Sequence, residues 1–286
     1  MVISMKLLEG KKVAQALDET MTKRVEELKK KGVTPGLAVI LVGDNSASAV
    51  YVRNKKRRAE KLGIDFQLIH FDATVTETEL LKKIDELNHD ENVDGFIVQL
   101  PVPDHIDEDK VIEAIDPRKD VDGFTPISVG NLWIGTPLTK PATASGILMM
   151  LDHYNVDLDG KNVVIVGRSN IVGKPTAALM LDRNATVTIT HSHTKNLKEI
   201  TSKADVLVVA IGKAKFITKE YVKDQAIVVD VGMDRDENGK LCGDVDFDDV
   251  KQKAAMMTPV PGGVGPMTIT ALVDQVIELA EGRANG

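Results

Sequence analysis

The chain has 286 residues, of which 36 are basic and 43 acidic, so its formal net charge is −7. Its 43% apolar and 28% charged residues are typical of a soluble globular protein and exclude extended disorder. The acidic balance and the aromatic content of 3% argue against nucleic-acid binding, which normally needs basic surfaces and stacking side chains. The single cysteine, Cys242, excludes an intramolecular disulfide.

The first residues lack the pattern of a signal peptide, and no apolar run reaches the roughly 18 residues that a membrane helix needs. We therefore expect a cytoplasmic protein without membrane contact. At about 150 residues per domain, the length predicts two domains.

Short apolar segments alternate with amphipathic ones in two series. The predicted strands are Leu37–Gly43, Asp65–Phe71 and Gly95–Pro101, followed by Asn162–Gly167, Thr186–His191, Val206–Gly212 and Ala226–Gly232. The helices predicted in the first series are Ser46–Leu62 and Thr76–Asn88, and Thr76 with Glu79 forms a capping-box pattern at the start of the second. This alternation indicates an α/β fold built from βαβ units with mostly parallel sheets.

A segment rich in turn-forming residues, Asp116–Pro141, separates the two series. We place a catalytic α/β domain at residues 1–140 and a Rossmann-type domain at residues 141–267, with a cleft between them. An amphipathic helix is predicted at Thr268–Glu281, and residues 268–286 are expected to pack back onto the first domain.

The predicted strand Asn162–Val166 runs directly into the turn Gly167-Arg-Ser-Asn-Ile-Val-Gly173 and then into an alanine-rich helix. Glycines let the backbone approach a pyrophosphate closely, and the helix N-terminus supplies N–H donors. The spacing differs from the usual G-x-G-x-x-G pattern, so an ordinary strand-to-helix turn remains an alternative.

The next predicted strand ends in His191-Ser192-His193-Thr194-Lys195, without an acidic residue. NAD-binding proteins usually carry Asp or Glu there to accept from the ribose 2′-hydroxyl. Hydroxyl and cationic groups suit a 2′-phosphate, which Arg168 could bind in a bidentate manner, so the sequence predicts NADP. His191 and His193 are an alternative pair of metal ligands, but no third ligand cluster is evident and we predict no metal site.

Tyr51 and Lys55 lie four residues apart on a strongly basic predicted helix and therefore share a face. For most of these cations a solvated face is the better interpretation. Lys55 lies near strand ends, where open α/β sheets bind ligands, and a lysine in a partly apolar cleft can act as general acid or base. A solvated lysine is the alternative.

Gln99 lies at the carboxyl end of strand Gly95–Pro101, and Asp122 belongs to the loop Asp120-Val-Asp-Gly123 after a predicted helix at Asp107–Ile115. Gln99 either orients a ligand or caps the strand end. Asp122 either forms a turn or binds paired N–H donors of a heterocycle. The spacing alone leaves both alternatives open.

Five motifs together resemble the bifunctional methylenetetrahydrofolate dehydrogenase/methenyltetrahydrofolate cyclohydrolase family in its compact bacterial form. They are Tyr51-Val-Arg-Asn-Lys55, Gln99-Leu-Pro-Val-Pro103, Lys119-Asp-Val-Asp-Gly-Phe124, Gly167-Arg-Ser-Asn-Ile-Val-Gly173 and Pro259-Val-Pro-Gly-Gly-Val-Gly-Pro-Met-Thr268. The resemblance covers nearly the whole chain. It implies that one site oxidises 5,10-methylenetetrahydrofolate with NADP+ and hydrolyses the methenyl product to 10-formyltetrahydrofolate. It also implies a homodimer formed through the cofactor domains.

The resemblance implies the following roles. Lys55 moves protons in the hydrolysis, Gln99 hydrogen-bonds Lys55, Tyr51 stacks on or orients the folate, and Asp122 grips the pterin edge. Substrate-binding positions are Tyr51, Val52, Arg53, Asn54, Lys55, Gln99, Leu100, Pro101, Asp122, Pro261, Gly262, Gly263, Val264 and Gly265. Cofactor-binding positions are Gly167, Arg168, Ser169, Ser192, Thr143 and Met233.

Two positions depart from the family pattern. Where the family usually reads Pro-Cys-Thr-Pro-x-Gly, this chain has Pro141-Ala-Thr-Ala-Ser-Gly146. Loss of the second proline predicts a looser connection between the domains and a changed placement of the nicotinamide. His193 stands where relatives often carry Arg or Lys, which weakens the prediction of NADP over NAD.

Three other functions remain as alternatives. A shikimate-dehydrogenase-like oxidoreductase shares the domain order but does not need Tyr51, Lys55 and Gln99. A non-catalytic folate- or nucleotide-binding protein would not need Lys55 and Gln99 either. A dehydrogenase with weakened cyclohydrolase activity is compatible with every motif.

Overall fold

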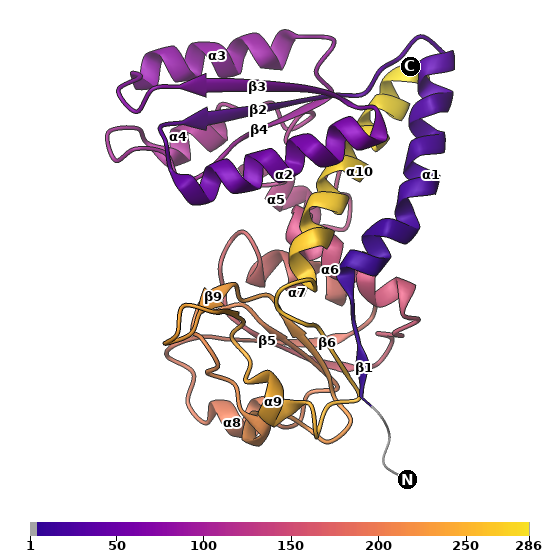
Figure 1. Cartoon of the computed structure of the whole chain (residues 1–286), viewed down its shortest axis with the longest axis vertical. Coiled ribbons are helices and arrows are strands. Elements are labelled where there is room, and N and C mark those ends of the chain that lie inside the picture. The colour runs from indigo at the N-terminus through magenta and orange to yellow at the C-terminus, as the bar shows by residue number, and fades with distance from the viewer. Residues whose placement is uncertain (1–4, 286) are drawn as a thin grey trace. The chain divides into compact units, whose positions relative to one another are not determined.

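The computed structural model describes residues 5–285, which fold into two compact units that we describe separately (Figure 1). Within the described residues, the first unit joins residues 5–15 to Thr143–Thr268, and the second joins Ala16–Ala142 to residues 269–285. Each unit combines helices with a parallel sheet, which confirms the predicted α/β class. No helix in the described part of the chain is long and apolar enough to cross a membrane.

The second unit contains a three-stranded parallel sheet with β2 (Gly36–Val42) between β3 (Asp65–Phe71) and β4 (Gly95–Val98). Helix α2 (Ser46–Leu62) leads from β2 to β3, and α3 (Glu77–His89) leads from β3 to β4. The second crossover runs back past β2, so right-handed connections place α2 and α3 on opposite faces, as Figure 1 shows. The carboxyl ends of β2 and β4 flank this reversal, where α/β sheets bind ligands.

Helix α3 begins with the predicted capping box. The Thr76 hydroxyl accepts from the Glu79 N–H at 3.2 Å, and the Glu79 carboxylate accepts from the Thr76 N–H at 3.0 Å. The helix buries Leu80, Ile84 and Leu87 against one face of the sheet. Helix α4 (Glu108–Glu113) completes this core.

The turn-rich segment at 116–141 contains a helix that the sequence analysis did not predict. Helix α5 spans Pro126–Trp133, and the Thr125 hydroxyl caps it by accepting from the Ser128 N–H at 3.2 Å. Pro126 occupies its first turn, where a missing N–H costs nothing. Taking every proline here as a turn former was wrong, because one of them starts a helix.

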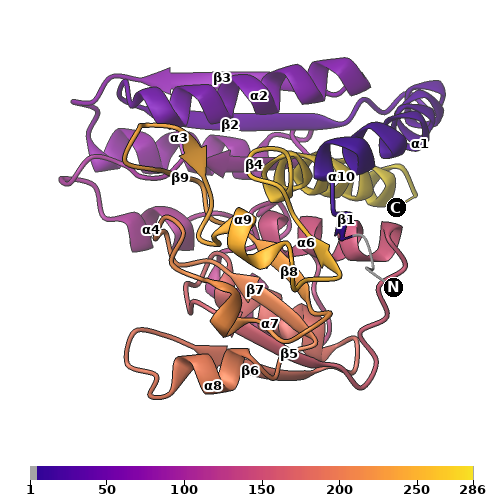
Figure 2. The same ribbon diagram turned by 60° about the horizontal axis from the view of Figure 1, so that its bottom comes forward.

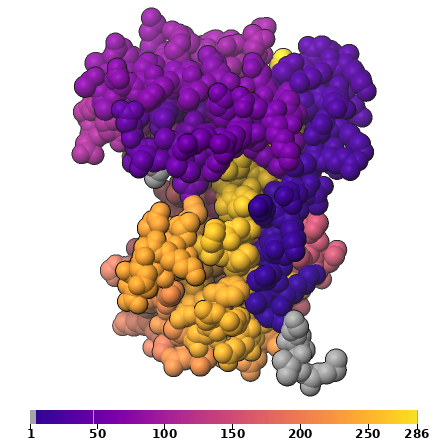
Figure 3. Space-filling model, viewed as in Figure 1, coloured from indigo at the N-terminus to yellow at the C-terminus, as the bar shows by residue number. Residues whose placement is uncertain are grey.

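Most of helix α1 (Gly10–Lys30) and of helix α10 (Val264–Asn285) belongs to the second unit, where the two helices lie side by side (Figures 1 and 3). Arg24 on α1 donates to Asp274 at 2.6 Å and to Glu281 at 2.8 Å. Arg283 donates to Asp94, just before β4, at 2.7 Å. These half-buried pairs attach the C-terminal helix to this unit, and the helix starts four residues before its predicted start at Thr268.

The first unit contains a six-stranded sheet with the order β1-β11-β8-β7-β5-β6, in which every pair is parallel (Figure 2). Its strands are β1 (Lys6–Leu7), β5 (Asn162–Val166), β6 (Thr186–Thr190), β7 (Val206–Val209), β8 (Ile227–Asp230) and β11 (Met256–Met257). The four strands predicted for this half correspond to β5–β8. Strand β1 differs from the prediction, which placed residues 1–140 together, because it pairs with β11.

The remaining elements of the first unit are short, apart from one helix. Helix α6 (Ala142–His153) carries the altered segment at its start, and Ala142 and Ala144 are both buried. The others are α7 (Gly173–Leu181), α8 (Leu197–Thr201), a 3-10 turn at Lys219–Tyr221, α9 (Phe247–Val250) and the antiparallel pair β9 (Asp234–Arg235) and β10 (Leu241–Cys242).

Two buried carboxylates hold the strand ends of the first unit together. Asp230 accepts from the N–H groups of Gly232, Asp244 and Val245 at 3.0 Å each, and burial raises its pKa to about 7 despite these donors. Asp244 accepts from the N–H of Ile211 at 2.8 Å. A Cβ at position 243 would lie 1.9 Å from an Asp230 oxygen, so this contact requires Gly243.

We expect Gly243→Ala to destabilise the protein by roughly 1–3 kcal/mol, because the added methyl displaces the Asp230 carboxylate from its N–H donors. Gly282→Ala, within helix α10, is the matched control, because a Cβ at this position would point into open space. That change should stabilise by about 0.5–1 kcal/mol. Urea unfolding midpoints measure both effects, and equal midpoints for the two variants would contradict the close contact.

Candidate active site

Lys55 and Gln99 form the centre of the site in the second unit. Lys55 lies on α2 with only 8% of its surface exposed, and its Nζ donates to Gln99 Oε1 at 3.1 Å. Gln99 follows β4, its N–H donates to the Ile40 carbonyl on β2 at 2.8 Å, and its Nε2 donates to the Leu100 carbonyl at 2.9 Å. These bonds fix the amide with its oxygen toward the lysine.

Lys55 and Asp122 influence each other's charge. Burial lowers the pKa of Lys55, and the negative charge of Asp122 opposes this effect. Burial raises the pKa of Asp122, Lys55 opposes that effect, and the nearby Asp120 adds to it. Both groups are thus shifted toward their neutral forms, which suits proton transfer near neutral pH.

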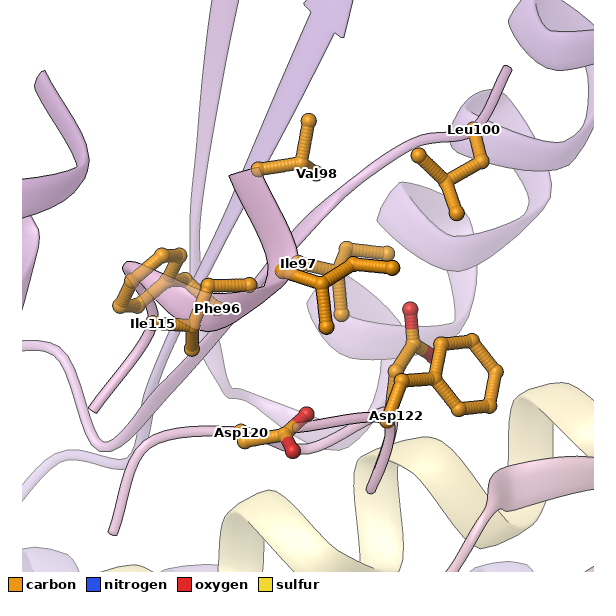
Figure 4. Close-up of a pocket in the computed structure, with 9 residues that line it drawn as sticks. Phe96, Ile97, Val98, Leu100, Ile115, Asp120 and Asp122 are labelled. Atoms are coloured by element: carbon orange, nitrogen blue, oxygen red, sulfur yellow. The ribbon is translucent and has the colours of Figure 1, made fainter. Parts of the chain in front are cut away.

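A small pocket beside Asp122 explains why burial acts on this carboxyl (Figure 4). It encloses about 10 Å³, the space of one water. Figure 4 shows Asp120 and Asp122 on one loop, with the Asp122 carboxylate pointing toward the side of the pocket where Leu100 lies. The apolar lining consists of Phe96, Ile97, Val98, Leu100, Ile112, Ile115 and Phe124.

Asp120 and Gln275 determine the shape of the loop that carries Asp122. The buried Asp120 carboxylate accepts from the N–H groups of Gly123 and Thr125 at 2.8 Å each. Gln275 on α10 donates to the Val121 carbonyl at 3.1 Å. In the sequence, Asp120 is recognisable only as part of a turn. Gln275 gives no signal at all, because it is a single glutamine within a predicted helix.

Asp122 differs from Asp120 in its hydrogen bonds. Within residues 5–285 its carboxylate accepts no hydrogen bond, whereas both oxygens of Asp120 are used. A half-buried carboxyl without internal donors has its acceptor capacity left for a ligand. This distinguishes the two aspartates, which their spacing in the sequence could not do.

The other predicted substrate positions on α2 are dispersed around the helix. Tyr51 lies one turn before Lys55, on a similar side, and is 38% exposed. Val52 is buried in the core, whereas Asn54 is exposed and Arg53 is exposed on the side of the helix opposite Lys55. Leu100 and Pro101 follow Gln99 and are joined by a cis peptide bond.

The predicted phosphate turn lies in the first unit between β5 and α7. Gly167 has a φ of +128°, and a Cβ there would lie 2.2 Å from the Ala210 carbonyl oxygen. Ser169 Oγ accepts from the N–H groups of Val172 at 3.1 Å and Gly173 at 3.2 Å, which caps the start of α7. The hydroxyl hydrogen of Ser169 and the exposed Arg168 are available as donors.

The loop after β6 begins beside this turn, because the Gly167 N–H donates to the Thr190 carbonyl at 2.9 Å. The His191 N–H donates to the Thr194 hydroxyl at 2.8 Å, and the ring centroids of His191 and His193 are 6.0 Å apart. Ser192 lies between them and is exposed. In the part of the chain that is described, no three His, Cys, Asp or Glu side chains are placed to hold a metal ion.

The segment Pro261–Gly265 belongs to the first unit, together with the predicted cofactor positions. The Gly262 carbonyl accepts from the Lys11 N–H at 3.0 Å, and α10 begins at Val264. Thr268 donates to the Thr143 hydroxyl at 3.2 Å. Met233, which follows β8, has 47% of its surface exposed. The predicted folate positions are therefore divided between the two units.

Two family models match most of the chain. The catalytic domain of tetrahydrofolate dehydrogenase/cyclohydrolase matches residues 8–122, and the NAD(P)-binding domain of the same enzyme matches residues 141–284. The chain belongs to the tetrahydrofolate dehydrogenase/cyclohydrolase family. The resemblance inferred from the five motifs is thereby confirmed.

Individual relatives agree over nearly the full length. The bifunctional protein FolD of Listeria innocua is 56% identical over 275 residues, covering 96% of this chain and 97% of that protein. The structure of the bifunctional FolD enzyme of Campylobacter jejuni is 46% identical with a TM-score of 0.96, covering 98% and 99% of the two chains. The Trypanosoma brucei enzyme, solved with NADP and an inhibitor, is 35% identical with a TM-score of 0.93 and covers 99% of each chain.

We expect Asp122→Asn to lower the pKa of Lys55 further, because the carboxylate charge that favours the ammonium form is removed. Glu60→Gln on the exposed side of α2 is the control and should leave the Lys55 pKa unchanged. The ¹³Cε resonance of Lys55, followed through a pH titration, gives the measurement. A pKa that stays the same or rises in Asp122→Asn would refute the electrostatic coupling.

Proposed function

We propose that this protein oxidises 5,10-methylenetetrahydrofolate to the methenyl form with NADP+ and hydrolyses that form to 10-formyltetrahydrofolate, as part of one-carbon metabolism. The observation that carries the proposal is the buried Lys55 amine, held by Gln99 and electrostatically coupled to Asp122. Membership of a family named for both activities supports it.

In the hydrolysis, Lys55 moves the protons. Water adds to the methenyl carbon, and its proton passes to the neutral Lys55 amine. The resulting ammonium donates this proton to N5 as the bond between N5 and the one-carbon unit breaks. The hydroxyl of the adduct loses its proton to the regenerated Lys55 amine, and from there to solvent, so its C–O bond becomes the carbonyl of the formyl group on N10. Gln99 accepts a hydrogen bond from Lys55 throughout, so the lysine keeps its position in both protonation states.

The dehydrogenation needs positioning more than acid–base catalysis. The departing hydride leaves a cation that its own two nitrogens stabilise, and NADP+ is the hydride acceptor. A neutral Lys55 does not repel this cation, which is consistent with the lowering of its pKa by burial. We assign pterin binding to the unpaired carboxyl of Asp122 and stacking or orientation of the folate to Tyr51. We also assign folate binding to Val52, Arg53, Asn54, Leu100, Pro101 and the loop Pro261–Gly265.

The turn in the first unit fits NADP. The start of α7 offers the positive end of a helix, Arg168 and Ser169 add donors, and residues 191–195 contain hydroxyl and cationic groups without a carboxylate. This donor set suits a 2′-phosphate better than a 2′-hydroxyl. We assign cofactor binding to Gly167, Arg168, Ser169 and Ser192, together with Thr143 and Met233.

We also propose that the protein is a cytoplasmic homodimer formed through the first unit, as the family resemblance implies. The relative molecular mass in solution tests the dimer. A sedimentation mass of one 31.1 kDa chain at micromolar concentration would contradict it.

We expect Lys55→Met to reduce cyclohydrolase activity by at least about 10²-fold while most dehydrogenase activity is retained, because only the hydrolysis needs a proton carrier. The variant should fold, since a buried methionine costs less than a buried amine. Absorbances of NADPH and of the methenyl form, followed together with NADP+ or NAD+, separate the two activities.

Lys56→Met is the matched control for this experiment, because Lys56 is exposed and, within residues 5–285, its one ion pair is with Glu60 on the same helix. It should retain both activities. Accumulation of the methenyl form by the unaltered protein would indicate a dehydrogenase with weak cyclohydrolase activity. Failure to reduce either cofactor would overturn the proposed function.

A further inference from the structure

The loop after β6 begins beside the phosphate turn, where the Gly167 N–H donates to the Thr190 carbonyl, and it carries two imidazoles. The His193 N–H donates to His191 Nδ1 at 3.2 Å, and the two rings meet edge to face. This bond occupies His191 Nδ1 as an acceptor. The exposed His193 ring makes no hydrogen bond within residues 5–285, so both of its nitrogens are available to a ligand.

The charges around this loop are mostly cations. Arg168 belongs to the turn before α7, Lys174 lies in the first turn of α7, and Lys195 precedes α8. On α8, Lys198 donates to Glu220, and Glu199 accepts from Lys203 at 3.0 Å. Among the described residues, no carboxylate forms an ion pair with His191 or His193. An anion arriving at this loop therefore meets imidazole, hydroxyl and cationic groups only.

We propose that His193 is a specificity-determining contact to the 2′-phosphate of the cofactor, so that the preference for NADP over NAD depends on pH. This inference rests on the proposed use of NADP. A protonated imidazole gives a phosphate a charge-assisted hydrogen bond, whereas a neutral imidazole gives a weaker one. An arginine in the same place would keep its charge at every pH.

The direction of the effect follows from two titrations. A phosphate monoester loses its second proton near pH 6, so from about pH 7 upward the charge of the ligand is constant. Histidine ordinarily changes charge between about pH 5 and 8. Affinity for NADP+ should therefore fall as the pH rises from 7 to 8.5, and affinity for NAD+, which lacks the phosphate, should stay level.

Calorimetric titration of the full-length protein with NADP+ and NAD+ at pH 7.0, 7.75 and 8.5 tests this. We expect the NADP+ dissociation constant to rise by about three- to tenfold over this range, the scale of one charged hydrogen bond. Titrations in buffers of different ionisation enthalpy should also show net proton uptake when NADP+ binds. Neither effect should occur with NAD+.

Three variants identify the responsible group. His193→Gln should bind NADP+ more weakly and without pH dependence, and His193→Arg should bind it tightly at all three pH values. Lys195→Gln, the matched control two residues away, should retain the pH dependence whatever its affinity. Unchanged NAD+ binding by each variant shows that the fold is intact.

The contradicting outcomes are distinct. Binding of NADP+ that does not change with pH, or a pH dependence that persists in His193→Gln, would overturn this inference and leave the proposed function standing. Absence of NADP+ binding at every pH would overturn both.

Discussion

The proposed chemistry of this protein depends on one hydrogen bond, from the buried Lys55 to Gln99. Burying an amine is unfavourable, and the sheet makes it possible by fixing an acceptor in place: the Gln99 backbone is attached to β2, and its side-chain amide is attached to the Leu100 carbonyl. The same burial that destabilises the ammonium form lowers the pKa of Lys55, which makes the residue a suitable base. Stability and reactivity are thus set by the same contact.

That contact exists because of the order of the strands. The chain passes from the central strand β2 to β3 and then across to β4, so the connections that leave the carboxyl ends of β2 and β4 diverge at the point of reversal. Lys55 comes from the helix after β2, and Gln99 comes directly after β4. Residues 44 positions apart in the sequence meet there without any long loop.

The elements that the sequence analysis located well are those with a strong local signal. The ranges of β3 and α2 match their predictions, and the Thr76 cap of α3 is present. The two-residue strand β1 is too short to show periodicity, and its pairing with β11 depends on a contact about 250 residues away in the sequence. Helix α5 was missed because Pro126 was taken as a turn former, although tertiary packing and the Thr125 cap support a helix.

In the site, too, the sequence identifies residues by local pattern but does not show which partners their side chains will have. Lys55, Gln99 and Asp122 could be named from motifs, but which aspartate of the loop binds a ligand could not be derived from the spacing. The hydrogen bonds of the two aspartates distinguish them. Asp120, Asp230 and Asp244 each accept from backbone N–H groups and so hold the fold, whereas Asp122 accepts from none of the described residues while facing an apolar pocket. A half-buried carboxyl without internal donors is costly for the fold, and in the proposed function a ligand that supplies those donors compensates for the cost.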